Sequence, residues 1–402
     1  MGIELNNQQI YALYEGETWF HKGTKQVFEI SGPSGSGKSS IIMYLIERLG
    51  LELDEVLFLA YMGKAAYRLA LLGLPARTIH SAIYDYKKVI MRDEDGKIIF
   101  DEKGRPKKEG KFVLKDRIGK GKTKLIVVDE GSMVNEKIGM DLLSFGIPVV
   151  VLGDLNQLPP VFGDPFFLKK PDVILTQIMR QKEGDPIIYL SQQVLAGREL
   201  EVGVYGKSEV IPRSSIKEFH FTKADMVLTE TNRLRWNINN YFREEIRQYK
   251  QLDYPHIGEK VICRKNNWKK SIDDGVFMTN GMTGYVDDVF KNTFDKKSMV
   301  MDFRPDFTNS VFKNIRFNYP YMYAIPTSAL SEENNSSLDK ALNDIYIDRF
   351  EYSYAITTHL SQGSQYNKVL FLNERMMRTK EDQIKLAYTA ITRAIDSISI
   401  VV

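Results

Sequence analysis

The sequence predicts an α/β protein built on two parallel sheets, and three observations support this. Between residues 26 and 180, short apolar runs rich in β-branched residues alternate with stretches of helical periodicity. These runs lack polar alternation, which is typical of strands that helices cover on both faces. A second series of the same kind starts at Met226. The 402 residues, of which 43% are hydrophobic, are enough for two to four modules.

The first series contains five expected strands, separated by segments that favour helices. The helix after the first strand is expected to begin near Lys38 and to end at Gly50, a residue typical of helix C-termini. Apolar residues recur at helical spacing between these two positions. The strands are expected at 26–30, 55–60, 125–128, 148–152 and 173–175.

An insertion interrupts this alternation at about 85–122. Asp95-Gly96 lies between two apolar stretches, 89–91 and 98–100, and this pair is typical of the turn of a β-hairpin. The segment 85–124 is also basic, because it contains fourteen Lys and Arg against eight Asp and Glu in a chain of net charge +3. Such a charge run is either a solvated surface or a nucleic-acid contact, and composition leaves both open.

The second series is split by a segment of different composition. Strands are expected at 226–229, 354–358, 369–372 and 398–402, and helices at 233–247 and 385–393. The intervening segment 282–348 is rich in aromatic and β-branched residues, with Asn, Asp and Pro between them. That composition indicates a small all-β module.

Composition also excludes several kinds of site. Cys263 is the only cysteine, so the chain can form no internal disulfide and no thiolate metal cage. The five histidines lack the spacing of metal ligands, and a structural metal is not expected. No apolar stretch approaches the ~20 residues of a membrane-spanning helix, and the first residues lack a signal-peptide pattern. We expect a cytoplasmic protein without a membrane partner.

A phosphate-binding loop follows the first expected strand. Residues 32–39, GPSGSGKS, fit the pattern G-x-x-x-x-G-K-[ST] between an apolar strand and a helix, the context that gives this pattern its meaning. Glycines allow backbone N–H groups to surround phosphate oxygens, and the helix N-terminus adds positive potential. The pattern assigns Lys38 to the β- and γ-phosphates and Ser39 to Mg²⁺. The expected nucleotide-binding residues are Gly32, Pro33, Ser34, Gly35, Ser36, Gly37, Lys38, Ser39 and Ser40.

An acidic pair supplies the second half of this site. Asp129 and Glu130 follow the apolar run at 125–128, and acids at a strand end beside the loop can hold Mg²⁺ and orient water. We expect Asp129 to bind the metal and Glu130 to act on the attacking water. Two acids favour hydrolysis of ATP over nucleotide binding alone.

These and further motifs, in their order along the chain, resemble the superfamily 1B helicases of the RecD and phage Dda branch, and the resemblance covers nearly the whole chain. LNNQQ at 5–9 is similar to the family's N-terminal motif, which implies that Gln9 reads the adenine. GDLNQLPPV at 153–161 resembles the motif whose glutamine, here Gln157, senses the γ-phosphate. LTQIMRQ at 175–181 and AYTAITRA at 387–394 resemble motifs that carry arginine fingers, which implies this role for Arg180 and Arg393.

The resemblance also implies contacts with single-stranded DNA. Hydroxyls, amides and backbone N–H groups suit phosphate contacts that do not read base sequence. GKAA at 63–66, TIH at 78–80, TETNR at 229–233 and TTHLSQGS at 357–364 resemble the family's strand-contacting motifs. The residues implied are Lys64, Thr78, His80, Asn232, Arg233, Thr358 and His359, with Gly363 at the nucleotide. Phe100, near the tip of the hairpin, is expected to separate duplex strands, although an aromatic residue of a hairpin could equally pack against its own sheet.

The family layout implies two RecA-like domains with inserted modules. Domain 1A would span 1–178 with the hairpin 1B inserted, domain 2A would span 179–281 and 349–402, and 282–348 would form an SH3-like domain 2B. The chain departs from the family at Tyr61-Met62, Leu360 and Gln365, where Pro-Thr, lysine and glutamate are usual. These departures bear on the DNA contacts and leave the expected ATPase positions intact.

The sequence therefore predicts an ATP hydrolase that moves 5′ to 3′ on single-stranded DNA and unwinds duplexes. The expected cofactors are ATP and Mg²⁺, and the expected partners are single-stranded DNA, its junctions with duplex DNA, and proteins of replication, repair or recombination. A monomer in a bacterial or phage-infected cell is expected. Three alternatives stay open: a translocase that displaces proteins without unwinding, a P-loop kinase, and a strand-binding protein that does not hydrolyse ATP.

Overall fold

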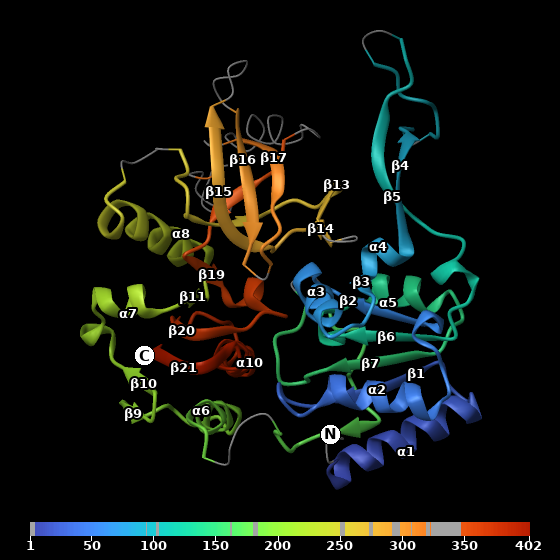
Figure 1. The fold of residues 1–402 in the computed structure, drawn as a ribbon, viewed down its shortest axis with the longest axis horizontal. Helices are drawn as coiled ribbons and strands as arrows, with labels where there is room; N and C mark the ends of the chain where they lie inside the picture. Colours follow the sequence, from blue (N-terminus) through green and yellow to red (C-terminus); the bar gives the residue numbers. More distant parts are fainter. Residues whose placement is uncertain are drawn as a thin grey trace.

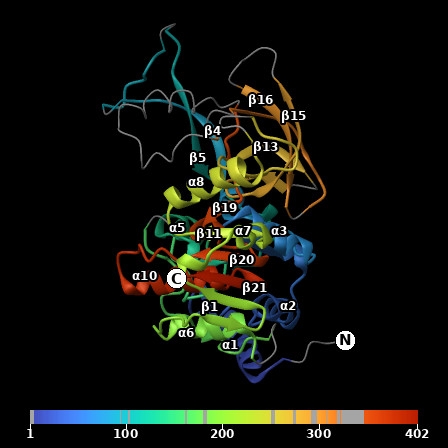
Figure 2. The same cartoon turned by 90° about the vertical axis from the view of Figure 1, so that its left-hand side faces the viewer.

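Two α/β units lie side by side, and two smaller β units project from the same end of the pair (Figures 1 and 2). The computed structural model describes residues 5–93, 95–101, 104–160, 163–179, 184–249, 254–272, 276–291, 298–306, 308–318, 322 and 347–402. Within them, no helix combines the length and the apolar character needed to cross a membrane.

The first α/β unit is a parallel sheet of six strands in the order β3-β2-β6-β7-β1-β8. Its strands are β1 (Val27–Ser31), β2 (Val56–Ala60), β3 (Ala76–Thr78), β6 (Leu125–Asp129), β7 (Val149–Gly153) and β8 (Val173–Ile174). Its helices are α1 (Asn7–Lys22), α2 (Lys38–Arg48), α3 (Gly63–Leu71), α4 (Ile79–Ile83) and α5 (Glu136–Leu143). Helices α1 and α2 cover one face and α4 and α5 the other, so the central strands are buried on both sides, as their unbroken apolar runs predict. The strand order brings the carboxyl ends of β1, β6 and β7 together.

The second α/β unit is a six-stranded sheet in the order β19-β11-β20-β21-β10-β9, parallel except for the edge strand β9. Its strands are β9 (Gly203–Tyr205), β10 (Ser208–Ile211), β11 (Met226–Thr229), β19 (Ala355–Thr357), β20 (Tyr366–Leu372) and β21 (Ala394–Val401). Its helices are α6 (Pro186–Leu195), α7 (Glu218–Lys223), α8 (Asn232–Tyr241) and α10 (Lys380–Ile391). The parallel α/β fold expected from the sequence is therefore confirmed, and Thr379 starts α10 five residues earlier than expected because its hydroxyl caps the helix.

An antiparallel sheet of five strands lies above the second α/β unit in the order β17-β16-β15-β12-β18. Its strands are β12 (Lys260–Cys263), β15 (Thr283–Lys291), β16 (Ser298–Pro305), β17 (Phe312–Asn318) and β18 (Phe350–Tyr352), and a ribbon of β13 (Asn267–Ile272) and β14 (Val276–Met278) accompanies it. The sheet reaches beyond the expected range 282–348 on both sides, through β12 and β18. Its core is continuous with that of the second α/β unit, since Phe303 and Val227 belong to one buried cluster.

A long hairpin leaves the first unit where α4 ends. It pairs β4 (Tyr84–Ile90) with β5 (Lys108–Leu114) in an antiparallel ladder. The expected turn at Asp95-Gly96 is present, because Gly96 N donates to Asp93 O at 2.9 Å. The expected pairing of 89–91 with 98–100 is wrong for the first two positions, however, since Val89 and Ile90 pair with Glu109 and Lys108. The longer ladder prevails because it aligns seven residue pairs without a break.

Candidate nucleotide site between the two sheets

The loop between β1 and α2 has the conformation that its glycines permit. Gly35 and Gly37 have φ angles of +85° and +83°, in the left-handed region that favours glycine. Gly32 lies so close to its neighbours that an added Cβ would be 2.8 Å from Ser36 Oγ and 2.9 Å from Leu175 Cβ. These constraints close the loop over the N-terminus of α2, whose free N–H groups can bind an anion.

Lys38 is turned back onto this loop. Its Nζ donates to the carbonyl oxygens of Gly32 at 2.6 Å and Pro33 at 2.9 Å. Burial lowers the pKa of Lys38, while the nearby carboxylates of Asp154, Glu130 and Asp129 act in the opposite direction. The ammonium therefore lies inside the loop, where phosphate oxygens can replace the two carbonyls.

The acidic pair stands at the end of β6, opposite the loop. Asp129 is buried, and its Oδ1 accepts from Glu130 N at 3.1 Å. Glu130 has a φ of +56°, which is unusual for a residue other than glycine and turns its side chain into the cleft. Burial and the Asp129 carboxylate raise the pKa of Glu130. A carboxylate with a raised pKa can accept a proton from water near neutral pH.

Arg68, in the middle of α3, is a candidate residue that the sequence analysis missed. Its Nη2 donates to Asp129 Oδ2 at 3.2 Å, and its side chain is 39% exposed. Lys64 lies one turn earlier on the same helix, so the spacing could have drawn attention to Arg68. Nothing in the sequence, however, indicates that a side chain of α3 reaches the end of β6.

Arg393 enters the same cleft from the second sheet. It is buried, and its guanidinium donates to Thr389 O, Ser364 O and Thr392 Oγ1 at 3.1, 3.1 and 3.2 Å. These three bonds hold the guanidinium in place, so little reorganisation is needed when an anion approaches.

The loop after β7 joins the two sheets. Leu158 N donates to Thr389 Oγ1 at 2.9 Å, and Leu158 O accepts from Gln362 Nε2 at 2.7 Å. Tyr388 OH donates to Asp154 Oδ2 at 2.8 Å. The same loop carries Gln157, which is buried and lines the cleft. A movement of Gln157 on nucleotide binding would therefore be passed to the second sheet through the bonds of Leu158 and Asp154.

These groups line one cavity of about 450 Å³. It collects residues from both sheets, and most of the expected nucleotide-binding residues are among them. The lining consists of Gln9, Ser34, Gly35, Gly37, Lys38, Ser39, Ser40, Arg68, Leu72, Asp129, Glu130, Gln157, Met179, Gln365 and Arg393.

Five expected residues are absent from this lining, namely Gly32, Pro33, Ser36, Gly363 and Arg180. Gly363 lies against α3 instead, since an added Cβ would be 3.4 Å from Ala65 Cβ. Arg180 lies outside the described residues. Gln9 lines the cavity, but both ends of its amide are engaged, with Nε2 donating to Ser36 O at 3.1 Å and Oε1 accepting from Asn6 N at 3.0 Å.

The cavity suits a magnesium ion that arrives with a nucleotide. Ser39 and Asp129 offer a hydroxyl and a carboxylate to the same space. Mg²⁺ takes one or two protein oxygens and completes its shell with phosphates and water. In the described part of the chain, no cluster of three or more His, Cys, Asp or Glu could hold a metal without such help.

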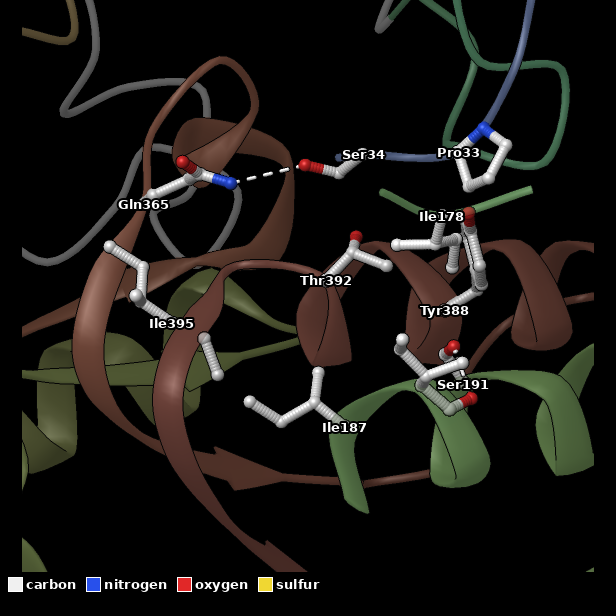
Figure 3. A pocket seen from close by; sticks show the side chains of 11 residues that line it. Pro33, Ser34, Ile178, Ile187, Ser191, Gln365, Tyr388, Thr392 and Ile395 are labelled. Atoms are coloured by element: carbon white, nitrogen blue, oxygen red, sulfur yellow. Dashed lines mark hydrogen bonds between the residues drawn. The ribbon is translucent and has the colours of Figure 1, made fainter. Parts of the chain in front are cut away.

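A second, smaller cavity of about 160 Å³ lies beside the first. Ser34 and Gln365 line both cavities, and Gln365 Nε2 donates to Ser34 Oγ at 3.1 Å (Figure 3). The bond joins the phosphate-binding loop to the second sheet at a position where the family usually has glutamate. Ile178, Ile187 and Ile395 make its remaining wall largely apolar.

The expected DNA-contacting residues fall into two groups. Lys64, Thr78 and Thr358 are engaged within the protein, where Lys64 Nζ contacts Asp306 Oδ2 at 3.1 Å, Thr78 Oγ1 caps α4 and Thr358 Oγ1 donates to Thr229 O. Thr358 is fully buried, so its side chain is closed to a ligand. The second group consists of the half-buried His80 and His359 and the exposed Asn232 and Arg233 at the start of α8. Burial lowers the pKa of both histidines.

Comparison with known proteins identifies related sequences and folds. Residues 17–163 match the family described as AAA domain, and residues 352–401 match the UvrD-like helicase C-terminal domain. The chain is 25% identical over 469 residues to an uncharacterised protein of Methanocaldococcus jannaschii, across 91% of this chain and 36% of that protein. It is 28% identical over 191 residues to the ATP-dependent DNA helicase Dda of Enterobacteria phage T4, across 44% of this chain and 39% of Dda. The chain thus spans less than two-fifths of the length of these relatives.

Solved structures with the same fold include two Pif1 helicases. The Candida albicans enzyme superposes with a TM-score of 0.53 at 17% identity, covering all of this chain and 94% of that one. The Bacteroides enzyme in complex with ADP-AlF3 and single-stranded DNA gives a TM-score of 0.51 at 17% identity, covering 99% of this chain and 92% of that one. The two family matches, the similarity to Dda and the shared fold together make the chain similar to the superfamily 1B helicases of the Dda and Pif1 type.

Proposed function

We propose that the chain is an ATP-dependent DNA helicase that moves 5′ to 3′ along a single strand and couples hydrolysis in the cleft to unwinding. One observation carries the proposal: Lys38, Asp129 and Glu130 of the first sheet share a cavity with Arg393 of the second. A cation from the second sheet can stabilise a transferring phosphoryl group only while the cleft is closed, so hydrolysis becomes linked to movement between the sheets.

The positions of the cavity residues support a role for each of them in ATP hydrolysis. Lys38 exchanges its two loop carbonyls for phosphate oxygens. Glu130 takes a proton from the attacking water, and Gln157 orients that water or the phosphate beside it. Arg393 stabilises the charge that develops on the transferred group. The family resemblance gives the role of a second arginine finger to Arg180, which lies outside the described residues. Ser39 and Asp129 would hold Mg²⁺, which neutralises phosphate charge when bound.

The DNA path and the domain boundaries are part of the same proposal. We assign 1–178 to domain 1A, 179–281 with 349–402 to domain 2A, and 282–348 to the inserted domain 2B, which takes β12 and β18 as flanking strands. Phe100 on the hairpin is the proposed wedge between duplex strands, and it is exposed. The direction of movement rests on the resemblance to the RecD and Dda branch. Monomeric action, a cytoplasmic location and work with replication or recombination proteins stay predictions.

Unwinding of two matched duplexes tests the proposal. One duplex has a 5′ single-stranded tail and the other a 3′ tail, and each is followed in a single turnover with ATP. Unwinding of the 5′-tailed duplex alone is the expected result. Unwinding of the 3′-tailed duplex would overturn the direction, and ATP hydrolysis stimulated by a single strand without unwinding would indicate a protein-displacing translocase.

The Lys38→Ala variant tests the site itself. We expect it to lose ATP hydrolysis, because it lacks the ammonium group that would exchange its two loop carbonyls for phosphate oxygens. It should keep nucleotide-free binding to a single strand, measured by fluorescence anisotropy. Lys22→Ala, which removes an exposed lysine at the end of α1, is the matched control and should hydrolyse ATP normally. Hydrolysis at the normal rate by Lys38→Ala would refute the assignment.

A further inference from the structure

Five rings form a continuous series of contacts from the first sheet into the stem of the hairpin. Tyr61 contacts His80, which contacts both Tyr84 and Phe112, and Phe112 contacts Tyr86. The ring centroids of these four contacts lie 6.0, 5.7, 6.4 and 5.4 Å apart in that order. We call this series the aromatic ladder. It starts at the end of β2 and runs past α4 onto β4 and β5.

The two ends of the aromatic ladder have different environments. At the lower end, Tyr61 and Tyr84 pack against the buried core beneath the first sheet. At the upper end, Tyr86 is 55% exposed and Phe112 is 45% exposed, although they face each other directly across the hairpin. Both rings therefore remain accessible to a ligand on a thin, two-stranded ribbon.

The surroundings of the open rings favour a polyanion with aromatic rings of its own. The segment 85–124 that carries them is strongly basic, with fourteen Lys and Arg against eight Asp and Glu. Unpaired nucleic acid offers both features, since every base has a face that can stack on an aromatic side chain.

The backbone that carries the upper rings of the aromatic ladder is held in place by strand pairing, which favours stacking of a ligand. Tyr86 and Phe112 lie inside the hydrogen-bonded β4–β5 ladder, whereas Phe100 lies beyond it on an isolated bridge to Pro106. A platform whose rings are already held by neighbours loses little conformational freedom when a ligand binds. The lowered pKa of His80 keeps its ring uncharged, which suits contact with neighbouring rings.

We propose that Tyr86 and Phe112 form a stacking site for unpaired bases of a nucleic-acid strand. The stem of the hairpin would then bind the strand, whereas Phe100 near the tip has the different role of separating duplex strands. This inference rests on the proposed function, because it places a strand beside the first sheet. It goes beyond that function by assigning base contacts to the stem.

The test compares two strands of equal length and charge, one of intact dT nucleotides and one whose central nucleotides are abasic. Both carry a fluorophore, and the nucleotide-free protein is titrated at several salt concentrations. The double variant Tyr86→Leu/Phe112→Leu keeps apolar side chains on the ribbon but removes both rings. We expect it to bind the intact strand about tenfold more weakly than the unaltered protein, since one stacked base contributes about that factor. It should bind the abasic strand as the unaltered protein does, with the same dependence on salt.

Two further variants keep the result interpretable. Tyr86→Phe retains the ring and should bind the intact strand normally, which shows that the hydroxyl and the fold are not the cause. Tyr11→Leu removes an equally exposed tyrosine, 54% exposed on α1, and should have no effect. An equal loss of affinity for both strands, or no loss for either, would overturn the stacking site. Stimulation of ATP hydrolysis by the intact strand, measured on the unaltered protein, reports separately on the proposed motor, so failure of one proposal is distinguishable from failure of the other.

Discussion

The hydroxyl of Tyr388 forms a hydrogen bond between the two α/β units, and removing this one oxygen atom tests how strongly the bond holds the units together. Tyr388 is 1% exposed and its hydroxyl donates to Asp154 Oδ2 at 2.8 Å, across the cleft between α10 and the loop after β7. Burial and the Asp154 carboxylate raise the pKa of Tyr388, so the phenol stays protonated and remains a donor. A buried hydrogen bond to a charged acceptor contributes about 1.5–3 kcal/mol.

The Tyr388→Phe variant removes this bond and little else. A loss of about 2 kcal/mol corresponds to a fall of about thirtyfold in the ratio of closed to open protein. Dyes attached to cysteines introduced at Lys22 and Thr222, both exposed, would report that ratio by energy transfer. The native Cys263 is fully buried and does not compete for the dye. We expect the ratio of closed to open protein and the rate of ATP hydrolysis to fall together, because the proposed mechanism needs the closed state to bring Arg393 to the phosphate.

The control for this variant is Tyr189→Phe, which removes an equally simple hydroxyl from an exposed position on α6. It should leave both the energy transfer and the hydrolysis rate unchanged. If Tyr388→Phe kept the ratio of closed to open protein within twofold of that of the unaltered protein, the bond to Asp154 would not hold the cleft closed.

Three further predictions concern the cavity and its surroundings. Arg68→Gln should lower kcat for ATP hydrolysis about fivefold to tenfold in a steady-state assay, since its half-exposed ion pair is worth about 1 kcal/mol, and Arg68→Lys should restore part of the loss. Gly37→Ala should weaken binding of a fluorescent ATP analogue, because its φ is positive and an added Cβ would collide with Gln9 Nε2; Gly50→Ala, which has a positive φ and open space, is the control and should bind normally. Burial lowers the pKa of His80 below its ordinary 6.5, so the unfolded chain takes up the proton first as the pH falls below that value. The free energy of unfolding, measured with denaturant from about pH 7.5 to pH 5.5, should therefore fall in this range, and less so in His80→Gln.

The sequence alone determined the local structures of this protein, namely those set by residues that are close together in the chain. The glycine spacing of 32–39 predicts the loop, and the loop takes the left-handed backbone at Gly35 and Gly37 that this spacing permits. The unbroken apolar run before Asp129 predicts a buried parallel strand, and β6 ends at that residue. In a parallel sheet the carboxyl ends of all strands lie along one edge. The same patterns therefore also indicate that the loop and the two acids lie at the same edge of the sheet.

Only the tertiary structure decided which distant side chains meet. Arg68 reaches Asp129 because β2, the strand that precedes α3, pairs with β6. Lys64, on the same helix, forms an ion pair with Asp306, which follows β16 of the antiparallel sheet. Val89 pairs with Glu109 because the long ladder of the hairpin is more stable than the short one that the Asp95-Gly96 turn suggests. Spacing along the chain fixes which elements form and where they end. The partner of a long polar side chain depends on how elements far apart in sequence pack together, and no local pattern carries that information.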